Sequence, residues 1–233
     1  MVEIAIGNRM KRSAINNMTY PIFYSLQHCP YAMRARFGLM LAKQAVMLRA
    51  VVMKNKPPEM LELSAKGTVP VLQLEDGRVI DESLDIMLWA LANNDPDDLL
   101  LKQQQEKSAA MFALIAQNDN EYIDWLEKYK YAKRKHQADE LMCRQQCELF
   151  IAELEQRLSK HAYFLGDKPC LADYAILPFI RQFARVDRQW YLQAPYPELR
   201  RWLNHHLQQP MFTKVMAKFP LWLDCEEAFL FAG

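Results

Sequence analysis

The sequence predicts a small α/β domain followed by a larger all-helical domain. Three observations lead to this division. Short apolar runs alternate with a helical pattern at the start of the chain, a polar stretch with a central proline follows (NNDPDD), and the remainder has helical periodicity. The expected parts are an N-terminal extension (1–19), the α/β domain (20–92), a linker (93–98) and the helical domain (99–233).

Four runs in the first domain have the composition of strands. The turn signal Glu75-Asp76-Gly77 separates the last two and predicts a hairpin. After Cys29-Pro30 in the sequence, one face of a predicted helix carries Met33, Phe37 and Met40. The order is therefore β-α-β, a hairpin and a final helix. The expected strands are 21–26, 46–53, 69–74 and 78–81, and the expected final helix is 83–92.

The second domain shows helical periodicity and no strand pattern. Its helical segments are separated by breaks that contain proline, at 166–169, 195–197 and 210. The expected helices cover about 100–130, 136–160, 171–187, 197–208 and 211–219.

Charge and composition narrow the classes of partner. The formal net charge is +1, so no global field attracts nucleic acid or an acidic membrane, and neither is an expected partner. No apolar stretch approaches the roughly 18 residues of a membrane span. No hydrophobic block follows Lys11 and Arg12, and the five cysteines have no disulfide-framework spacing, so a cytoplasmic protein with free thiols is expected.

One local run of charge stands out in the helical domain. Its basic residues are interleaved with Tyr129 and Tyr131, which fits either a patch for a polyanion or a solvated helix face. The solvated face is the favoured interpretation, because charge runs usually serve solubility. The basic residues are Lys128, Lys130, Lys133, Arg134 and Lys135.

Cys29 is the candidate nucleophile. It lies between a predicted strand and a helix whose first residue is Pro30, a position that suits proline. The free N–H groups and the dipole at a helix start favour an anion, which lowers a thiol's pKa. A buried structural cysteine also fits this position, but Arg34 and Arg36 nearby favour reactivity. Because Ala32 replaces the second cysteine of a C-x-x-C pair, a redox cycle needs an external thiol.

A second candidate site lies at the start of the helix predicted from residue 83. The free N–H groups and the Ser83 hydroxyl suit a carboxylate, and Glu82 suits an ammonium group. Together they suit an amino-acid-like moiety, although an ordinary N-cap also fits. Val69-Pro70 precedes a strand, where proline belongs at an end or an edge, and the sequence alone leaves its isomer open.

The order and spacing of four segments resemble the cysteine-type glutathione transferases, and the omega class is the most similar. The likeness spans roughly residues 20–220 and is most specific in the first domain. A helix-start motif at 164–173 (FLGDKPCLAD) extends it into the second. The four segments are Cys29-Pro30-Tyr31-Ala32, Lys54-Asn55-Lys56-Pro57, 66–72 (KGTVPVL) and Asp81-Glu82-Ser83.

This resemblance implies a thioredoxin-like N-terminal domain, a helical glutathione-transferase domain and glutathione as co-substrate. It makes Cys29 the redox nucleophile and places Val69 against the glutathione backbone, ahead of a cis-Pro70. It assigns the γ-glutamyl end to Glu82 and Ser83, and the glycyl carboxylate to Lys56. It also implies a homodimer.

The chain departs from the family motif at Cys170, where the family has serine or threonine with Asp173 as its capping partner. Thiols are poor acceptors. We expect a cap weaker by about 1 kcal/mol and no loss of function.

Other chemistry has little support. Cys143, Cys147 and His136 are too few for a recognisable metal site, so no metal is expected. Tyr122 and Trp125 fit either a pocket for an apolar co-substrate or core packing, and His205-His206 is expected on a solvated helix surface.

The predicted activity is glutathione-dependent thiol transfer or reduction of a disulfide or a small electrophile. Cys29 attacks the substrate to form a mixed disulfide, and free glutathione resolves it. Two alternatives stay open: a conjugating transferase, and a non-enzymatic regulator on the same fold resembling the RNA-polymerase-associated stringent starvation proteins.

Overall fold

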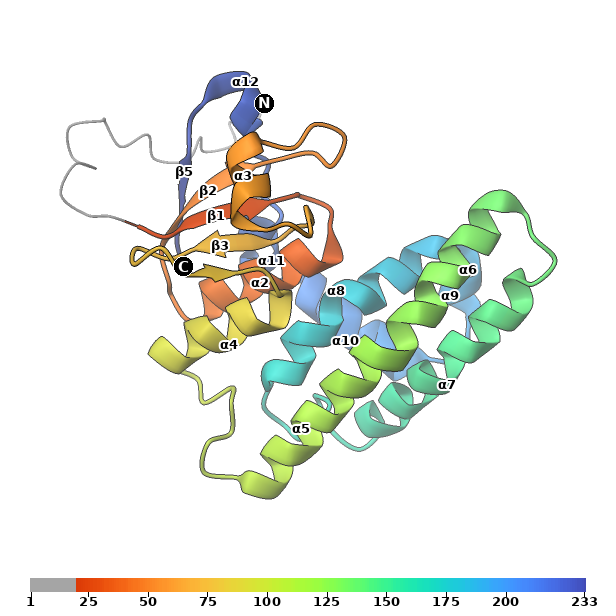
Figure 1. Cartoon of the computed structure of the whole chain (residues 1–233). Helices are drawn as coiled ribbons and strands as arrows, with labels where there is room; N and C mark the ends of the chain where they lie inside the picture. The colour runs from red at the N-terminus through yellow and green to blue at the C-terminus, as the bar shows by residue number, and fades with distance from the viewer. Residues whose placement is uncertain (1–19) are drawn as a thin grey trace, which may run out of the picture. The chain divides into compact units, whose positions relative to one another are not determined.

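The computed structural model describes residues 20–233, so the predicted extension 1–19 lies outside the described residues. The chain forms two compact units (Figure 1). Unit 1 comprises the described residues up to Pro96 together with Lys214–Gly233, and unit 2 is Asp97–Thr213. The expected helical domain ran to residue 233; in the structure, the residues from 214 onward belong with the first unit instead.

Unit 1 is built on a mixed five-stranded sheet with the order β4-β3-β1-β2-β5. The β1/β2 pair is parallel, and the other pairs are antiparallel. The predicted hairpin is the β3/β4 pair, and the thioredoxin-like fold is confirmed. The strands are β1 (Ile22–Ser25), β2 (Val46–Ala50), β3 (Val71–Gln73), β4 (Val79–Ile80) and β5 (Phe229–Phe231).

Three helices accompany the first four strands: α2 (Pro30–Leu41), α3 (Pro58–Leu63) and α4 (Ser83–Asn93). Helices α2 and α4 pack closely on each other at Gly38. A Cβ atom at this position would lie 2.6 Å from the Cα of Met87, so only glycine permits the approach. The short helix α3 was not predicted from the sequence.

The end of the chain returns to unit 1 as a strand. The prediction of no strand after the linker is wrong here, because β5 pairs antiparallel with β2 and Phe231 is opposite Val46. Just before β5, Trp222 in α12 (Trp222–Cys225) donates to Glu59 Oε1. The guanidinium of Arg49 lies 3.9 Å from the Trp222 ring centroid. These contacts anchor the C-terminal segment to strand β2 and helix α3.

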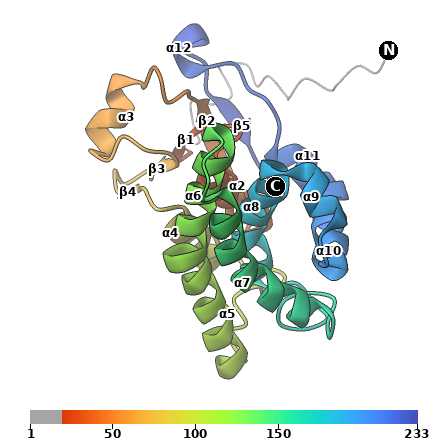
Figure 2. The same cartoon turned by 90° about the vertical axis from the view of Figure 1, so that its right-hand side faces the viewer.

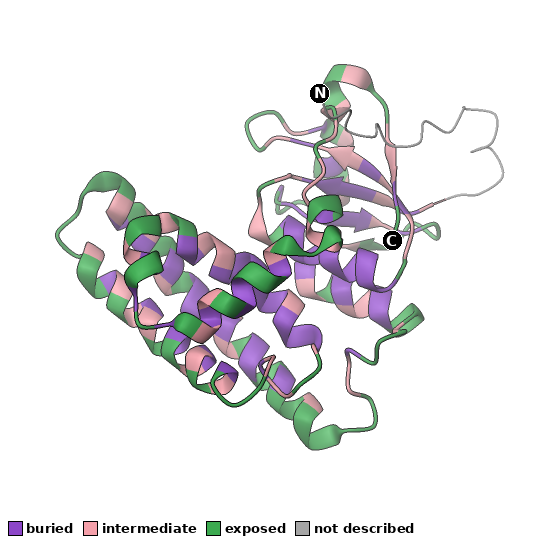
Figure 3. Ribbon diagram, turned by 180° about the vertical axis from the view of Figure 1, so that it is seen from behind, coloured by how far each residue is buried: buried purple, intermediate pink, exposed green. Residues whose placement is uncertain are grey.

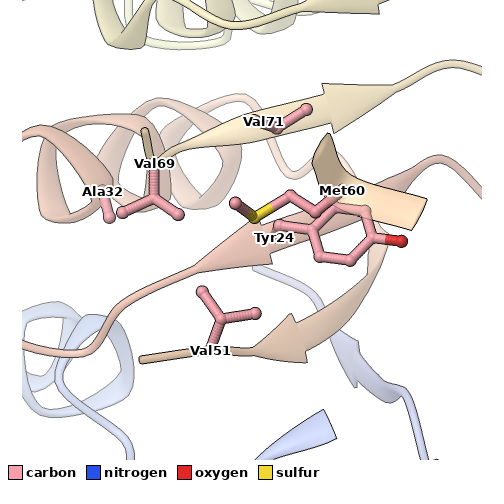
Figure 4. Packing of buried hydrophobic residues seen from close by; sticks show 6 residues of the cluster. All are labelled: Tyr24, Ala32, Val51, Met60, Val69 and Val71. Atoms are coloured by element: carbon pink, nitrogen blue, oxygen red, sulfur yellow. The ribbon is translucent and has the colours of Figure 1, made fainter. Parts of the chain in front are cut away.

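A compact apolar cluster packs beside the β1–α2 loop (Figure 4). It joins side chains from β1, α2, α3 and the segment around β3, and Cys29 packs against it. The sulfur of Cys29 therefore has an apolar wall on one side. The buried members are Tyr24, Ala32, Val51, Met60, Val69 and Val71.

Unit 2 is helical, as predicted. The segment expected over 100–130 forms three consecutive helical elements, with a π-helical turn between two α-helices. The two α-helices, α5 and α6, follow one another in Figure 2. Buried residues gather on the inner faces of the helices (Figure 3). The elements are α5 (Gln105–Gln117), η1 (Asn118–Tyr122), α6 (Ile123–Lys135), α7 (Glu140–Leu158), α8 (Leu171–Val186), α9 (Arg188–Gln193) and α10 (Pro197–Gln208), with α11 (Pro210–Val215) crossing the division between units.

The start of α8 is organised around a buried carboxylate. Asp173 accepts hydrogen bonds from the backbone N–H of Cys170 at 3.0 Å, the backbone N–H of Phe164 at 3.2 Å and the indole N–H of Trp202 at 2.9 Å. The Cys170 thiol lies 3.4 Å from the same carboxylate and donates to it. The residue that replaces the family's serine or threonine therefore stays inside the capping arrangement.

Among residues 20–233, no helix is long and apolar enough to cross a membrane.

Candidate active site around Cys29

Cys29 occupies the N-cap position of α2. Its backbone is extended, with φ −71° and ψ 126°, and Pro30 begins the helix. The Cys29 carbonyl accepts the first helical hydrogen bond, from Met33 N–H at 2.9 Å. The side chain is half-buried, and its Sγ lies 3.8 Å from the carbonyl oxygen of Val69. The thiol is thus at the positive end of the helix, where an anion is stabilised.

A buried cation from the same helix lies close to this thiol. Arg36 is 2% exposed, and its guanidinium donates to Ser25 Oγ at 2.9 Å and to the Gln27 carbonyl at 2.5 Å. Burial lowers the pKa of Arg36 to about 10, and the nearby Cys29 opposes that shift. Arg36 is therefore cationic at neutral pH. It both holds the loop that carries Cys29 and favours the charged form of the thiol.

The other cysteines are poorer candidates for nucleophile. Burial raises the pKa of Cys143, raises that of Cys147 to about 12 and raises that of Cys170. Cys225 is half-buried like Cys29, and its thiol donates to the Leu221 carbonyl at 3.2 Å. Of the described cysteines, Cys29 alone combines partial exposure with a place at a helix start beside a buried arginine.

The loop before β3 faces Cys29. The Val69–Pro70 peptide bond is cis, as the resemblance implied. No backbone hydrogen bond among residues 20–233 uses the N–H of Val69. At Gly67 the backbone has φ +58°, and an added Cβ would lie 3.2 Å from Lys56 Nζ. The loop therefore brings Lys56 close to Gly67, and it carries Val69, which the family resemblance places against glutathione's backbone.

The same loop also reaches the start of α4. Lys66 Nζ lies 2.5 Å from Glu82 Oε1 and 3.2 Å from Asp81 Oδ1. Ser64 Oγ donates to Asp81 Oδ2 at 2.7 Å. Glu82 is the exposed N-cap of α4, and Ser83 is its buried first residue. The carboxylate predicted to meet a ligand ammonium is already paired with a lysine.

The segment from Ser64 to Pro70 thus connects the predicted site residues. It contacts Cys29 through Val69, approaches Lys56 at Gly67 and pairs with Glu82 through Lys66. Sequence reasoning missed the pairing role of Lys66. Its only signal was a positive charge three residues before Val69-Pro70, which does not identify a partner.

Two other sequence candidates lie in unit 2 and contact other side chains there. Tyr122 is buried, with its ring 4.9 Å from the ring of Phe150, which is core packing. Trp125 lies under the ammonium of Lys128 at 4.0 Å. Among residues 20–233, no group of three or more His, Cys, Asp or Glu side chains could hold a metal ion.

A thiol at the start of the first helix, faced by a loop that ends in cis-Pro70, defines a thioredoxin-like thiol protein. Family models extend this classification to both units. Residues 23–98 match the model described as "Glutathione S-transferase, N-terminal domain", and residues 120–205 match "Glutathione S-transferase, C-terminal domain". Together the matches cover more than half of the chain, which belongs to the glutathione S-transferase family.

Individual relatives agree with this assignment. Glutathione S-transferase omega-1 of Mus musculus is 27% identical over 206 residues, which cover 84% of this chain and 80% of the relative. A solved glutathione S-transferase-I with bound lactoylglutathione superposes with a TM-score of 0.71 at 22% identity, covering 85% of this chain and 99% of that one. A family member from Pseudomonas fluorescens with two glutathiones bound has a TM-score of 0.73 at 15% identity, covering 84% and 92%. The two structures support the fold.

Proposed function

We propose that this protein is a glutathione-dependent thiol transferase and reductase with Cys29 as its nucleophile. The observation that carries the proposal is the placement of a half-buried thiol at the N-terminus of α2, beside the buried Arg36. A conjugating transferase needs a group that stabilises the thiolate of glutathione without reacting with it. A cysteine in that position instead forms a disulfide with glutathione.

The reaction has two thiol–disulfide exchanges. The Cys29 thiolate attacks the glutathione sulfur of a mixed disulfide, the substrate sulfur leaves as a thiolate that takes up a proton, and Cys29 is left bonded to glutathione. A second glutathione, as its thiolate, attacks the bound glutathione sulfur, which yields oxidised glutathione and restores Cys29. Because Ala32 is buried where a resolving cysteine would stand, the second step needs this external thiol.

Glutathione suits the groups around Cys29. Its backbone can pair with the N–H of Val69 ahead of Pro70, and its glycyl carboxylate can reach Lys56. Its γ-glutamyl ammonium and carboxylate suit Glu82 and the start of α4 at Ser83. The ammonium must share Glu82 with Lys66, or displace Lys66 from it. The glutathione ligands named for the two solved relatives support glutathione as the ligand.

Substitution of the nucleophile tests the proposal. Cys29→Ser should abolish the reduction of a glutathionylated peptide and leave the fold unchanged, whereas Cys225→Ser, which removes the other half-buried thiol, should retain the activity. Activity that survives Cys29→Ser would contradict the covalent mechanism. A wild-type protein that conjugates glutathione to an aromatic electrophile but reduces no disulfide would favour the conjugating transferase. No glutathione binding up to millimolar concentration would favour the regulator.

A homodimer is the proposed assembly, on family resemblance. Sedimentation at micromolar concentration measures it, and a monomer at that concentration would contradict it.

A further inference from the structure

The basic run at the end of α6 lines a cleft within unit 2. Helices α6 and α8 pack together and form its walls, so the cleft includes residues that the run in the sequence did not reveal. It is an open cleft with a volume of about 330 Å³. The lining residues are Lys130, Lys133, Arg134, Gln182, Arg185 and Val186.

The two lysines of the cleft already have carboxylate partners. Lys133 Nζ lies 2.8 Å from Asp187 Oδ2 and 2.9 Å from Glu140 Oε1, and these hydrogen bonds raise the pKa of Lys133. Lys130 Nζ lies 2.6 Å from Glu127 Oε1. The positions of these ammonium groups are therefore explained by pairs within the protein, and they add little uncompensated charge to the cleft.

The two arginines that line the cleft, Arg134 and Arg185, differ from the lysines in having no carboxylate partner among the described residues. Within the described part of the chain, no carboxylate lies within ion-pair distance of Arg134 or Arg185. Arg185 is also one helical turn from a third guanidinium, that of Arg181. Burial lowers the pKa of Arg181, and the charge of Arg185 lowers it further. Positive charge thus accumulates here without a matching anion.

A neutral side chain in the wall also has an unmet hydrogen bond. The Oε1 atom of Gln182 is buried and has no hydrogen-bond partner. A buried acceptor without a donor is costly, so turning the Gln182 side chain toward a donor brought by a ligand would be stabilising. The cleft therefore presents two uncompensated guanidinium groups, with the unused Gln182 acceptor buried in its wall.

From this combination we propose that the cleft binds a small anion of two or more charges that also carries a hydrogen-bond donor. Arginine forks bind phosphate and carboxylate groups through paired hydrogen bonds, so each guanidinium of the cleft can hold one anionic group. Organic phosphates and hydroxylated dicarboxylates share this chemistry. A nucleic acid strand instead needs an extended groove with stacking surfaces, which a cleft of this volume does not provide.

Calorimetry with two probes tests the proposal and separates the sources of the anion. The probes are pyrophosphate and malate, each titrated at low ionic strength into the full-length protein. The wild type is expected to bind at least one of them at one site per chain. Preference for pyrophosphate assigns the cleft to phosphates, and preference for malate assigns it to hydroxylated dicarboxylates.

Matched variants locate the binding. The double variant Arg134→Gln/Arg185→Gln should weaken it at least about tenfold, because charge-assisted hydrogen bonds are lost. The control Lys160→Gln/Lys168→Gln removes the same charge from exposed positions of unit 2 and should change affinity by less than about threefold. Gln182→Leu keeps every charge and should also weaken binding, which a general electrostatic effect would not explain.

Three results would overturn the proposal. One is no binding of either probe up to millimolar concentration. Another is an equal loss of affinity in the control and in the double arginine variant. The third is binding of a single-stranded oligonucleotide that depends on Arg134 and Arg185 when neither small anion binds, since this would assign the basic run to a polyanion. Far-UV circular dichroism of each variant shows whether a loss comes from unfolding, and both arginines are exposed, so their substitution should preserve the fold.

Discussion

Glu82 and Lys66 form an exposed pair at the start of α4, with side-chain exposures of 61% and 50%. Such surface pairs contribute little stability. Breaking the pair therefore costs the folded state little. A ligand with an ammonium beside a carboxylate can exchange partners with the pair, because its ammonium takes Glu82 while its carboxylate meets the helix start.

Replacing Glu82 by glutamine should weaken glutathione binding at least about tenfold, since one charge-assisted hydrogen bond is lost. Isothermal titration with glutathione measures the effect. Glu75→Gln is the matched control, because Glu75 is an exposed hairpin residue with the same charge. The rate at which iodoacetamide alkylates Cys29 should stay unchanged. Equal affinity in the wild type and Glu82→Gln would remove Glu82 from the glutathione site.

Asp173 makes a different contribution, inside the core of unit 2. Its burial raises its pKa to about 6, although four hydrogen-bond donors oppose the shift. The ordinary value is 3.8, so between about pH 4 and pH 6 the folded state binds more protons at this carboxyl than the unfolded state does. Its contribution to stability is therefore largest below that window and falls as the pH rises through it.

The free energy of unfolding of the wild type, measured relative to Asp173→Asn, should therefore fall as the pH rises from about 4 to about 6 and stay level above that. Urea denaturation across the range measures this difference. Burial lowers the pKa of His206 to about 4, but that histidine is present in both proteins, so the difference isolates Asp173. Asp167→Asn, at an exposed position, should show no such trend. A difference that rises with pH would contradict the assignment.

At the scale of elements, the first four strands were predictable because their apolar runs are bounded by clear turn signals. Strand β5 was not, because three residues after a helical stretch do not reveal that their partner is β2 near the other end of the chain. His206 was expected in solvent, yet it is buried. The signal was present, since Leu199, Trp202, Leu203 and His206 lie on one buried face of α10.

The candidate site was also only partly predictable, because local sequence patterns do not reveal contacts between distant segments. Cys29 was predictable because a strand followed by proline places it at a helix start. The pairing of Lys66 with Glu82 depends on how the loop before β3 approaches α4, and no local pattern encodes that approach. The joining of Arg185 to the basic run of α6 likewise depends on helix packing.

Strand β5 should contribute measurably to stability, since Phe231 is only 4% exposed. Phe231→Ala is expected to lower the free energy of unfolding by about 3 kcal/mol, as for other buried phenylalanines. Leu223→Ala, at a side chain 39% exposed, should cost much less. Urea denaturation of both variants measures the contrast. Equal effects would show that the pairing of β5 with β2 does not persist in solution.

On the scale of the whole molecule, the first unit combines residues 20–96 with residues 214–233. Residues 214–233 complete the sheet that also carries the loops around Cys29. The helical unit between these two parts has its own core around Asp173 and Trp202. The five cysteines are distributed over both units, so five thiols compete for reaction with oxidised glutathione.

Mass spectrometry of the intact protein after incubation with oxidised glutathione tests the central claim most directly. Because Ala32 stands where a resolving cysteine would be, we predict a single glutathione adduct, and peptide mapping should place it on Cys29. The Cys225→Ser protein should give the same adduct, and Cys29→Ser should give none. An adduct confined to Cys143, Cys147, Cys170 or Cys225 would contradict the assignment of Cys29 as the nucleophile.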